Sequence, residues 1–196
     1  MARGRGQWDR SLTPELRHAE HRRALLAALD EAAAAPGRTL TVEHVLQRAQ
    51  VGRNTFYRHF PDLETAIRAS TDLGARALAE SLDAALRDAR TPIEQLRSLT
   101  TAWLQRAAAH PGQILLLLED AGPDGPRAVT VLEARLSRVA SAARSSGAVG
   151  LQPDPWRLRA LAGAFAECAR HVARHAGPNL SPPLDTLVDL VLRALR

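Results

Sequence analysis

Apolar residues recur along this chain at intervals of three and four, which is the spacing of one face of an α-helix. Taken with proline, glycine and N-cap residues as boundaries, this pattern predicts about nine helices. We expect them at residues 14–35, 42–49, 53–60, 63–87, 92–110, 113–119, 127–145, 153–175 and 182–196. No alternating segment reaches a useful strand length, so the predicted fold class is all-α.

The composition is typical of a globular helical protein. Of the 196 residues, 45% are hydrophobic and 24% are charged, and an aromatic share of 4% argues against a β-sandwich. The single cysteine, Cys168, excludes an internal disulfide and a cysteine-rich metal site, and it favours a reducing, cytoplasmic setting. The chain has neither a secretory h-region nor an apolar run long enough for a membrane span, so we expect no membrane partner.

Positive charge is concentrated near the N-terminus. The formal net charge is +5, and every basic residue is arginine. Residues 1–60 contain 10 arginines and 6 acidic residues, whereas residues 61–196 contain 16 arginines and 15 acidic residues. This asymmetry indicates either a solvated basic tail or a nucleic-acid interface at one end of the protein.

Residues 41–60, TVEHVLQRAQVGRNTFYRHF, combine a short helix, a tight turn and a second short helix. This arrangement matches a helix-turn-helix, whose second helix enters the DNA major groove. At 100° per residue, Phe56 and Phe60 share the buried face of that helix, and Asn54 and Arg58 lie opposite them.

The exposed side of the second helix carries side chains suited to DNA. Arginine can bind guanine and asparagine can bind adenine in a bidentate way, so we expect Arg53, Asn54 and Arg58 to contact bases. We expect Thr55, Tyr57 and His59 to contact phosphates and fix the register. The alternative is an ordinary amphipathic helix with a solvated polar face.

Residues 16–68 resemble the DNA-binding domain of the TetR (tetracycline-repressor-like) transcriptional regulators. The resemblance rests on Thr41, on Ala49 and Val51 around the turn, on the run from Thr55 to Phe60, and on an acidic helix start at Asp62. It adds Thr41 to the expected DNA-binding residues. It implies an all-α homodimer that binds a palindromic operator on double-stranded DNA and is released by a small molecule bound in the C-terminal domain.

Four positions depart from the family pattern. Gln50 replaces the usual turn glycine and is expected in a left-handed conformation. Leu46 replaces a small alanine, which implies a looser or shifted helix crossing, and Gly52 replaces the serine N-cap of the recognition helix. Leu63 replaces a phosphate-contacting lysine, for which Arg68 or the N-terminal arm could compensate.

Three regions follow from these observations. We expect a flexible basic arm at residues 1–13 and a three-helix DNA-binding domain at residues 14–68. We expect a helical ligand-binding and dimerisation domain at residues 69–196. The last two helices carry apolar residues at 3-4 spacing, either as core helices or as a two-fold interface. The resemblance implies the second arrangement, with a homodimer formed through residues 153–196.

The C-terminal region offers weaker evidence for a ligand. Trp103, Leu117, Trp156 and Phe165 could line an apolar cavity for an effector that the sequence does not identify, although such residues are more often core filler. The pair His171 and His175 lacks a third metal ligand, and neither a phosphate loop nor a nucleophile elbow is present. We therefore expect no metal, no cofactor and no enzymatic activity.

Two functional hypotheses remain at this point. The first is a ligand-responsive, dimeric DNA-binding repressor, which the charge asymmetry and the residues Arg53, Asn54 and Arg58 favour. The second is a helical dimeric interaction protein, or a degenerate homologue, that does not read DNA. Leu63, Gln50 and the modest net charge keep this second hypothesis open.

Overall fold

The computed structural model describes residues 13–35, 37, 39–122, 125–147, 155–175 and 181–194. Within them the chain forms nine helices, which confirms the all-α prediction. Their bounds are α1 (Pro14–Ala33), α2 (Val42–Ala49), α3 (Arg53–His59), α4 (Leu63–Arg87), α5 (Pro92–Ala109), α6 (Pro111–Glu119), α7 (Arg127–Ser145), α8 (Pro155–His175) and α9 (Ser181–Ala194).

Local capping signals determine where most helices begin. The side chains of Thr13, Thr41 and Asp62 accept hydrogen bonds from backbone N–H groups in the first turns of α1, α2 and α4. Thr91 and Glu94 form a reciprocal capping box at the start of α5. These contacts lie within a few residues of each other along the chain, so the sequence pattern could place the boundaries closely.

Several helix ends differ by one or two residues from the sequence-based boundaries, and the region of α6 shows the clearest differences. Helix α6 begins at Pro111, directly after a corner at His110 (φ −134°, ψ 61°), and not at residue 113. The residues after α6 form a short antiparallel pair, β1 (Ala121–Gly122) with β2 (Gly125–Pro126). Each strand has only two residues, which is too short for an alternating pattern to reveal.

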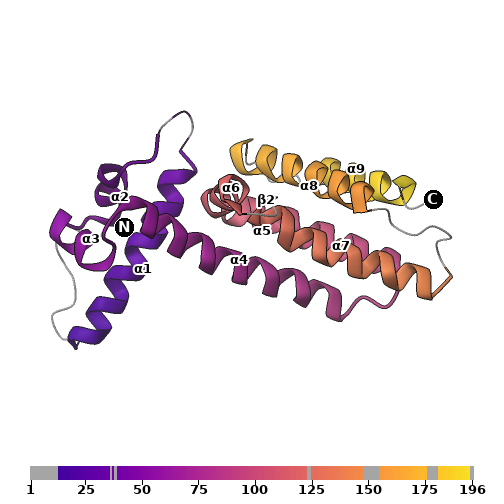
Figure 1. The fold of residues 1–196 in the computed structure, drawn as a ribbon, viewed down its shortest axis with the longest axis horizontal. Coiled ribbons are helices and arrows are strands. Elements are labelled where there is room, and N and C mark those ends of the chain that lie inside the picture. The colour runs from indigo at the N-terminus through magenta and orange to yellow at the C-terminus, as the bar shows by residue number, and fades with distance from the viewer. Residues whose placement is uncertain are drawn as a thin grey trace.

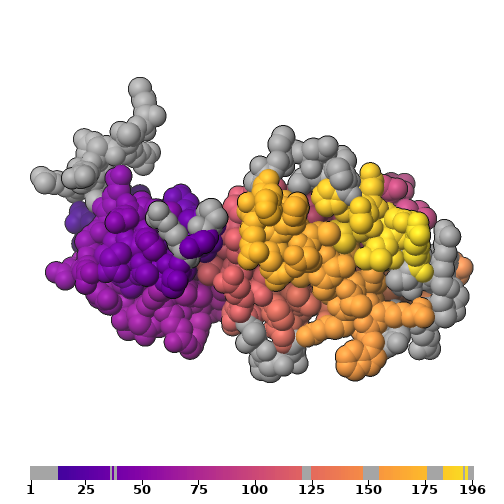
Figure 2. Space-filling view, turned by 90° about the horizontal axis from the view of Figure 1, so that it is seen from above, coloured from indigo at the N-terminus to yellow at the C-terminus, as the bar shows by residue number. Residues whose placement is uncertain are grey.

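The helices form a small N-terminal unit and a larger bundle (Figure 1). Helices α1, α2 and α3 lie at one end, and α4 runs from this unit along the bundle. In the bundle, α5 and α7 lie between α4 on one side and α8 and α9 on the other. The space-filling view places the N-terminal unit at one end of the long axis (Figure 2).

Helix α4 belongs to two hydrophobic cores. Ala66 in its second turn packs in the N-terminal core, whereas Leu78 and Leu82 pack in the core of the bundle. The predicted domain boundary at residue 68 therefore falls within a continuous helix. Leu116 of α6 also joins the N-terminal core, so both α4 and α6 connect the two units.

The apolar seam of the last two helices is covered largely by the chain itself. Leu187, Val188 and Val191 of α9 are buried within the bundle, as are Leu161 and Phe165 of α8. Among the large hydrophobic residues of α9 whose side chains are described, Leu190 is exposed, at 41%. A second subunit would therefore have to bind the outer faces of α8 and α9, not the inner seam.

No helix within the described residues is both long enough and apolar enough to cross a membrane.

Candidate nucleic-acid interface

The turn between α2 and α3 depends on one residue in a left-handed conformation. Gln50 has φ 54° and ψ 39°, which confirms the expectation from the sequence. Its backbone N–H donates to the carbonyl oxygen of Leu46, as does the N–H of Val51, at 3.4 Å. Gly52 is the N-cap of α3 and has no side chain to close the first turn. The turn thus sets the direction of α3 through backbone hydrogen bonds.

Two phenylalanines hold α3 against the rest of the N-terminal unit. Phe56 and Phe60 are 0% and 1% exposed and pack with Leu25, Leu29 and Val45. This confirms the predicted buried face of α3. Leu63, which stands where the family usually carries lysine, is half-buried against the same core.

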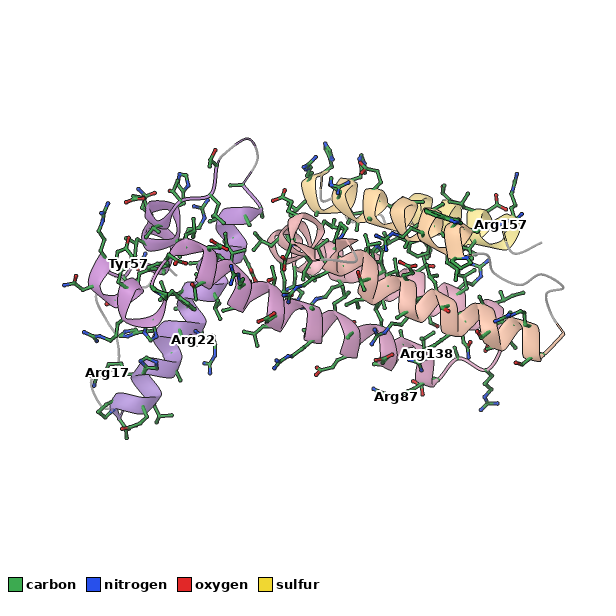
Figure 3. All side chains as sticks on the ribbon, viewed as in Figure 1. Arg17, Arg22, Tyr57, Arg87, Arg138 and Arg157 are labelled. Atoms are coloured by element: carbon green, nitrogen blue, oxygen red, sulfur yellow. The ribbon has the colours of Figure 1, made fainter. Side chains whose placement is uncertain are left out.

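The opposite side of α3 is exposed and polar. Arg53, Asn54 and Arg58 are all exposed, and Tyr57 retains 51% of its accessible surface. Thr55 is half-buried at the edge of this face. The structure therefore brings five of the seven predicted DNA-binding side chains to one face of α3. Tyr57, which belongs to this face, lies at the end of the molecule (Figure 3).

Arg53 forms an ion pair with another residue of the helix-turn-helix. Its guanidinium donates to the carboxylate of Glu43 on α2, and both side chains are more than half exposed. Such exposed pairs contribute little to stability, so a phosphate or a guanine can compete for the arginine. The sequence pattern does not reveal this pair, because the two residues lie ten positions apart.

Thr41 stabilises the start of α2 through a side-chain hydrogen bond. Its hydroxyl oxygen accepts a hydrogen bond from the backbone N–H of His44 at 3.4 Å, and its side chain is half-buried. Thr41 therefore caps α2, the helix that precedes the turn. A contact between Thr41 and DNA remains a prediction.

The position of His59 differs from the expected phosphate contact. Its ring centroid lies 4.1 Å from that of His18 and 6.0 Å from that of His21, both on α1. Both ring nitrogens are buried and lack a hydrogen-bond partner among the residues that the structure describes. Because α3 packs on α1, the imidazole faces that helix and presents no nitrogen to solvent.

Burial is the main cause of an unusual titration in this histidine cluster. Desolvation lowers the pKa of His59 below its ordinary value, and neighbouring cationic groups lower it further. The pKa of His21 is lowered for the same reasons. The fold therefore disfavours the protonated form of both rings relative to an exposed histidine.

Helix α1 adds positive charge beside α3, which sequence reasoning did not assign. Arg17 and Arg22 lie on α1 at the same end of the molecule as Tyr57 (Figure 3). The guanidinium of Arg22 lies 4.8 Å from the ring centroid of Phe60, at the end of α3. The positive surface thus extends from α3 onto α1.

Three of the four predicted ligand residues lie in one buried core, and the fourth, Trp156, lies apart from them. Trp103, Leu117 and Phe165 have no exposed surface and belong to the bundle core. The indole N–H of Trp103 donates to the carbonyl oxygen of Phe165 at 2.9 Å. Trp156 is 80% exposed at the start of α8. In the described residues, no group of three or more His, Cys, Asp or Glu side chains could hold a metal ion.

Comparison with known proteins identifies the fold. No protein-family model and no curated protein sequence matches the chain. A regulatory protein of the TetR family from Rhodococcus RHA1 matches with a TM-score of 0.70 and 19% identity, over 90% of this chain and 97% of that one. A TetR transcriptional regulator from Streptomyces coelicolor matches with a TM-score of 0.55 and 26% identity, over 89% of this chain and 98% of that one.

A TetR-family regulator from Thermus thermophilus is a further match, with a TM-score of 0.65 and 17% identity, over 89% of this chain and 96% of that one. The helix-turn-helix and the helical bundle define a class, the DNA-binding transcription regulators. Within that class, the chain has the fold of the TetR family, which confirms the resemblance seen in the sequence.

Proposed function

We propose that this protein binds a palindromic DNA operator as a homodimer, with α3 in the major groove, and acts as a repressor of transcription in the cytoplasm. The observation that carries the proposal is the two-sided construction of α3. Phe56 and Phe60 anchor one side, and Arg53, Asn54 and Arg58 project from the other. Such a helix can enter the groove without losing its own packing.

The side chains on the exposed face divide by chemistry. Arg53, Asn54 and Arg58 read base edges, because their planar groups match the hydrogen-bonding edges of guanine and adenine. Thr55 and Tyr57 bind phosphate oxygens. Thr41 contributes from the first turn of α2, which it also caps. His59 acts through its packing on α1, since its nitrogens face inward.

Two copies of the chain pair through the C-terminal helices, within residues 153–196. The fold supports this arrangement because α8 and α9 form an outer layer of the bundle, on the side away from α4 (Figure 1). Small residues on the outside of α8, among them Ala160 and Gly163, permit a close approach of a second helix. A two-fold axis between the copies accounts for a palindromic operator.

Release from DNA is proposed to follow the binding of a small molecule, and no enzymatic step is involved. Trp103, Leu117 and Phe165 form one candidate site, which would have to open because all three are fully buried. Trp156 lies outside that cluster and would take part only if α8 moved or a second subunit covered it.

Selection of bound duplexes from a random DNA pool, with the full chain, tests the proposal. We expect enrichment of a palindromic site. Arg58→Ala should then cost roughly 1–3 kcal/mol on that site and relax the base preference. Tyr57→Phe should weaken all duplexes about equally. Lack of enrichment by the wild-type chain would favour the alternative, a helical interaction protein that does not read DNA.

A further inference from the structure

A cavity of about 920 Å³ lies where the N-terminal unit meets the bundle. Its walls come from the end of α1, the segment that follows it, the first turns of α4, the second half of α6 and the end of α8. Leu40, Ile67, Leu115 and Leu116 supply apolar surface. The cavity is separate from the cluster of Trp103, Leu117 and Phe165 inside the bundle.

Three helices direct their C-terminal ends at this cavity. Ala33 of α1, Glu119 of α6 and His175 of α8 are the last residues of their helices, and all three line it. In Figure 1 the end of α8 lies next to α6 and to the upper end of α1. The last carbonyl groups of a helix lack partners within the helix, so each end carries partial negative charge.

Basic residues offset this charge at only one of the three ends. Helices α1 and α6 have no basic residue in their last turns, whereas α8 has Arg174 and His175. The His175 ring is held on α8 itself, stacked on His171, with Nδ1 3.1 Å from the carbonyl oxygen of that residue. The side of the cavity formed by α1 and α6 is therefore electronegative.

Of the two carboxylates at the end of α6, Glu119 strengthens that field, whereas Asp120 is neutralised by an arginine. Asp120 lies at the end of α6 and is paired with the Nε of Arg127 at 2.9 Å. Glu119 is exposed at the cavity wall and forms no ion pair with any other residue that the structure describes. Arg174 is also exposed, on a long side chain that can turn towards solvent. Glu119 thus supplies a free negative charge beside an apolar wall.

We propose that this cavity binds an amphipathic organic cation, with its charge near Glu119 and the end of α6 and its apolar body against Leu40, Ile67 and Leu115. Charge complementarity selects the cation, and the apolar wall selects a hydrophobic body. Because the cavity lies between the two units, an occupant would change how they sit relative to each other. That consequence for DNA rests on the proposed function, whereas the binding itself does not.

Two ions of matched shape and opposite charge test the binding step. Tetraphenylphosphonium and tetraphenylborate are titrated separately into the full chain, without DNA, by isothermal calorimetry. We expect saturable binding of the phosphonium at one site per chain, and binding of the borate that is weaker by at least about tenfold. Tighter binding of the borate, or no saturable binding of the phosphonium, would overturn the proposal.

Charge variants then locate the bound cation. Glu119→Gln should weaken phosphonium binding about two- to fivefold, as expected for loss of one partly exposed charge pair. Glu80→Gln, which removes an exposed carboxylate from α4 outside the cavity, should leave the affinity unchanged. Arg174→Gln should strengthen binding. If Glu119→Gln had no effect, or if Arg174→Gln weakened phosphonium binding, the assignment would be wrong.

A second measurement separates this proposal from the proposed function. The duplex enriched from the random pool is titrated with the wild-type chain, with and without saturating phosphonium. A shift in DNA affinity that Glu119→Gln reduces supports a regulatory site. If the chain bound no DNA but still bound the phosphonium with the expected variant profile, the cavity assignment would stand and the proposed function would fail.

Discussion

Gly112, in the first turn of α6, lies directly against the backbone carbonyl of Asp30 in α1. A β-carbon at residue 112 would come within 1.6 Å of that oxygen. The Asp30 side chain is held in the same place, because it accepts a hydrogen bond from the Ser70 hydroxyl of α4 at 2.7 Å. The contact joins α1 to the bundle at the point where the DNA-binding unit meets it.

We expect Gly112→Ala to destabilise the protein by about 1–3 kcal/mol, because a methyl group there overlaps backbone that cannot turn aside. Chemical denaturation measures the free energy of unfolding. Gln105→Ala, at an exposed position on α5, is the control. It should change the free energy of unfolding by less than about 0.5 kcal/mol. Equal effects of the two variants would contradict the close contact.

The ion pair between Glu43 and Arg53 gives a prediction for DNA affinity. Glu43→Gln should raise affinity for the selected operator about two- to fivefold at low salt. In this variant Arg53 does not have to give up an ion pair with Glu43 before it binds DNA. Fluorescence anisotropy with a labelled duplex measures it. The control is Asp83→Asn, which breaks the ion pairs of Asp83 with Arg135 and Arg138 between α4 and α7 and should leave DNA affinity unchanged. A loss of affinity in Glu43→Gln would show that the pair orients Arg53 for binding.

The histidine cluster predicts a dependence of stability on pH. Burial and nearby cations lower the pKa values of His59 and His21 from the ordinary 6.5. The unfolded chain therefore binds more protons than the folded chain just below pH 6.5, so the free energy of unfolding falls as the pH drops from 7 through 6. The charged and titratable groups that face these rings are His18, Arg17, Glu20, Arg22 and Arg58.

His59→Phe should flatten this dependence, because it removes one of the two shifted groups and keeps a ring against α1. Denaturant unfolding at several pH values between 5 and 7.5 measures the slope. Leu73→Phe, at an exposed position on α4, is the control and should leave the slope as in the wild type. If the slope of His59→Phe also matched the wild type, His59 would not be the residue responsible.

The dimer prediction requires a position that the single chain does not bury. Leu187 and Val191 are unsuitable because they pack inside the bundle, whereas Leu190 is 41% exposed on α9. Leu190→Glu should shift the protein from dimer to monomer in light scattering while its helical content stays constant. Leu73→Glu, at an exposed position on α4, should remain dimeric. An unchanged dimer mass in Leu190→Glu would place the interface elsewhere.

The N-terminal arm, residues 1–13, lies almost wholly outside the described residues, and its role remains a prediction. Arg3, Arg5 and Arg10 could each neutralise a phosphate in both subunits. Deletion of residues 2–12 would then reduce the slope of log affinity against log salt by up to about five units. Titration at several salt concentrations measures this slope. An unchanged slope and affinity would assign every DNA contact to residues beyond the arm.

The sequence alone determined the helices and the faces of the recognition helix. Caps such as Thr41 and Asp62 act within one turn, and the positions of Phe56 and Phe60 follow from helical periodicity. The left-handed residue at Gln50 was also predictable, because the family that the sequence resembles usually carries glycine at that turn position. All of these features depend on residues that are close along the chain.

Only the tertiary structure decided which distant residues meet. Periodicity placed His59 on the flank of α3 but could not show that α1 covers its ring nitrogens. It did not reveal that Gly112 abuts Asp30, or that three helix ends surround one cavity. These contacts depend on how helices pack, and packing is set by shape and burial over the whole chain, which no local pattern encodes.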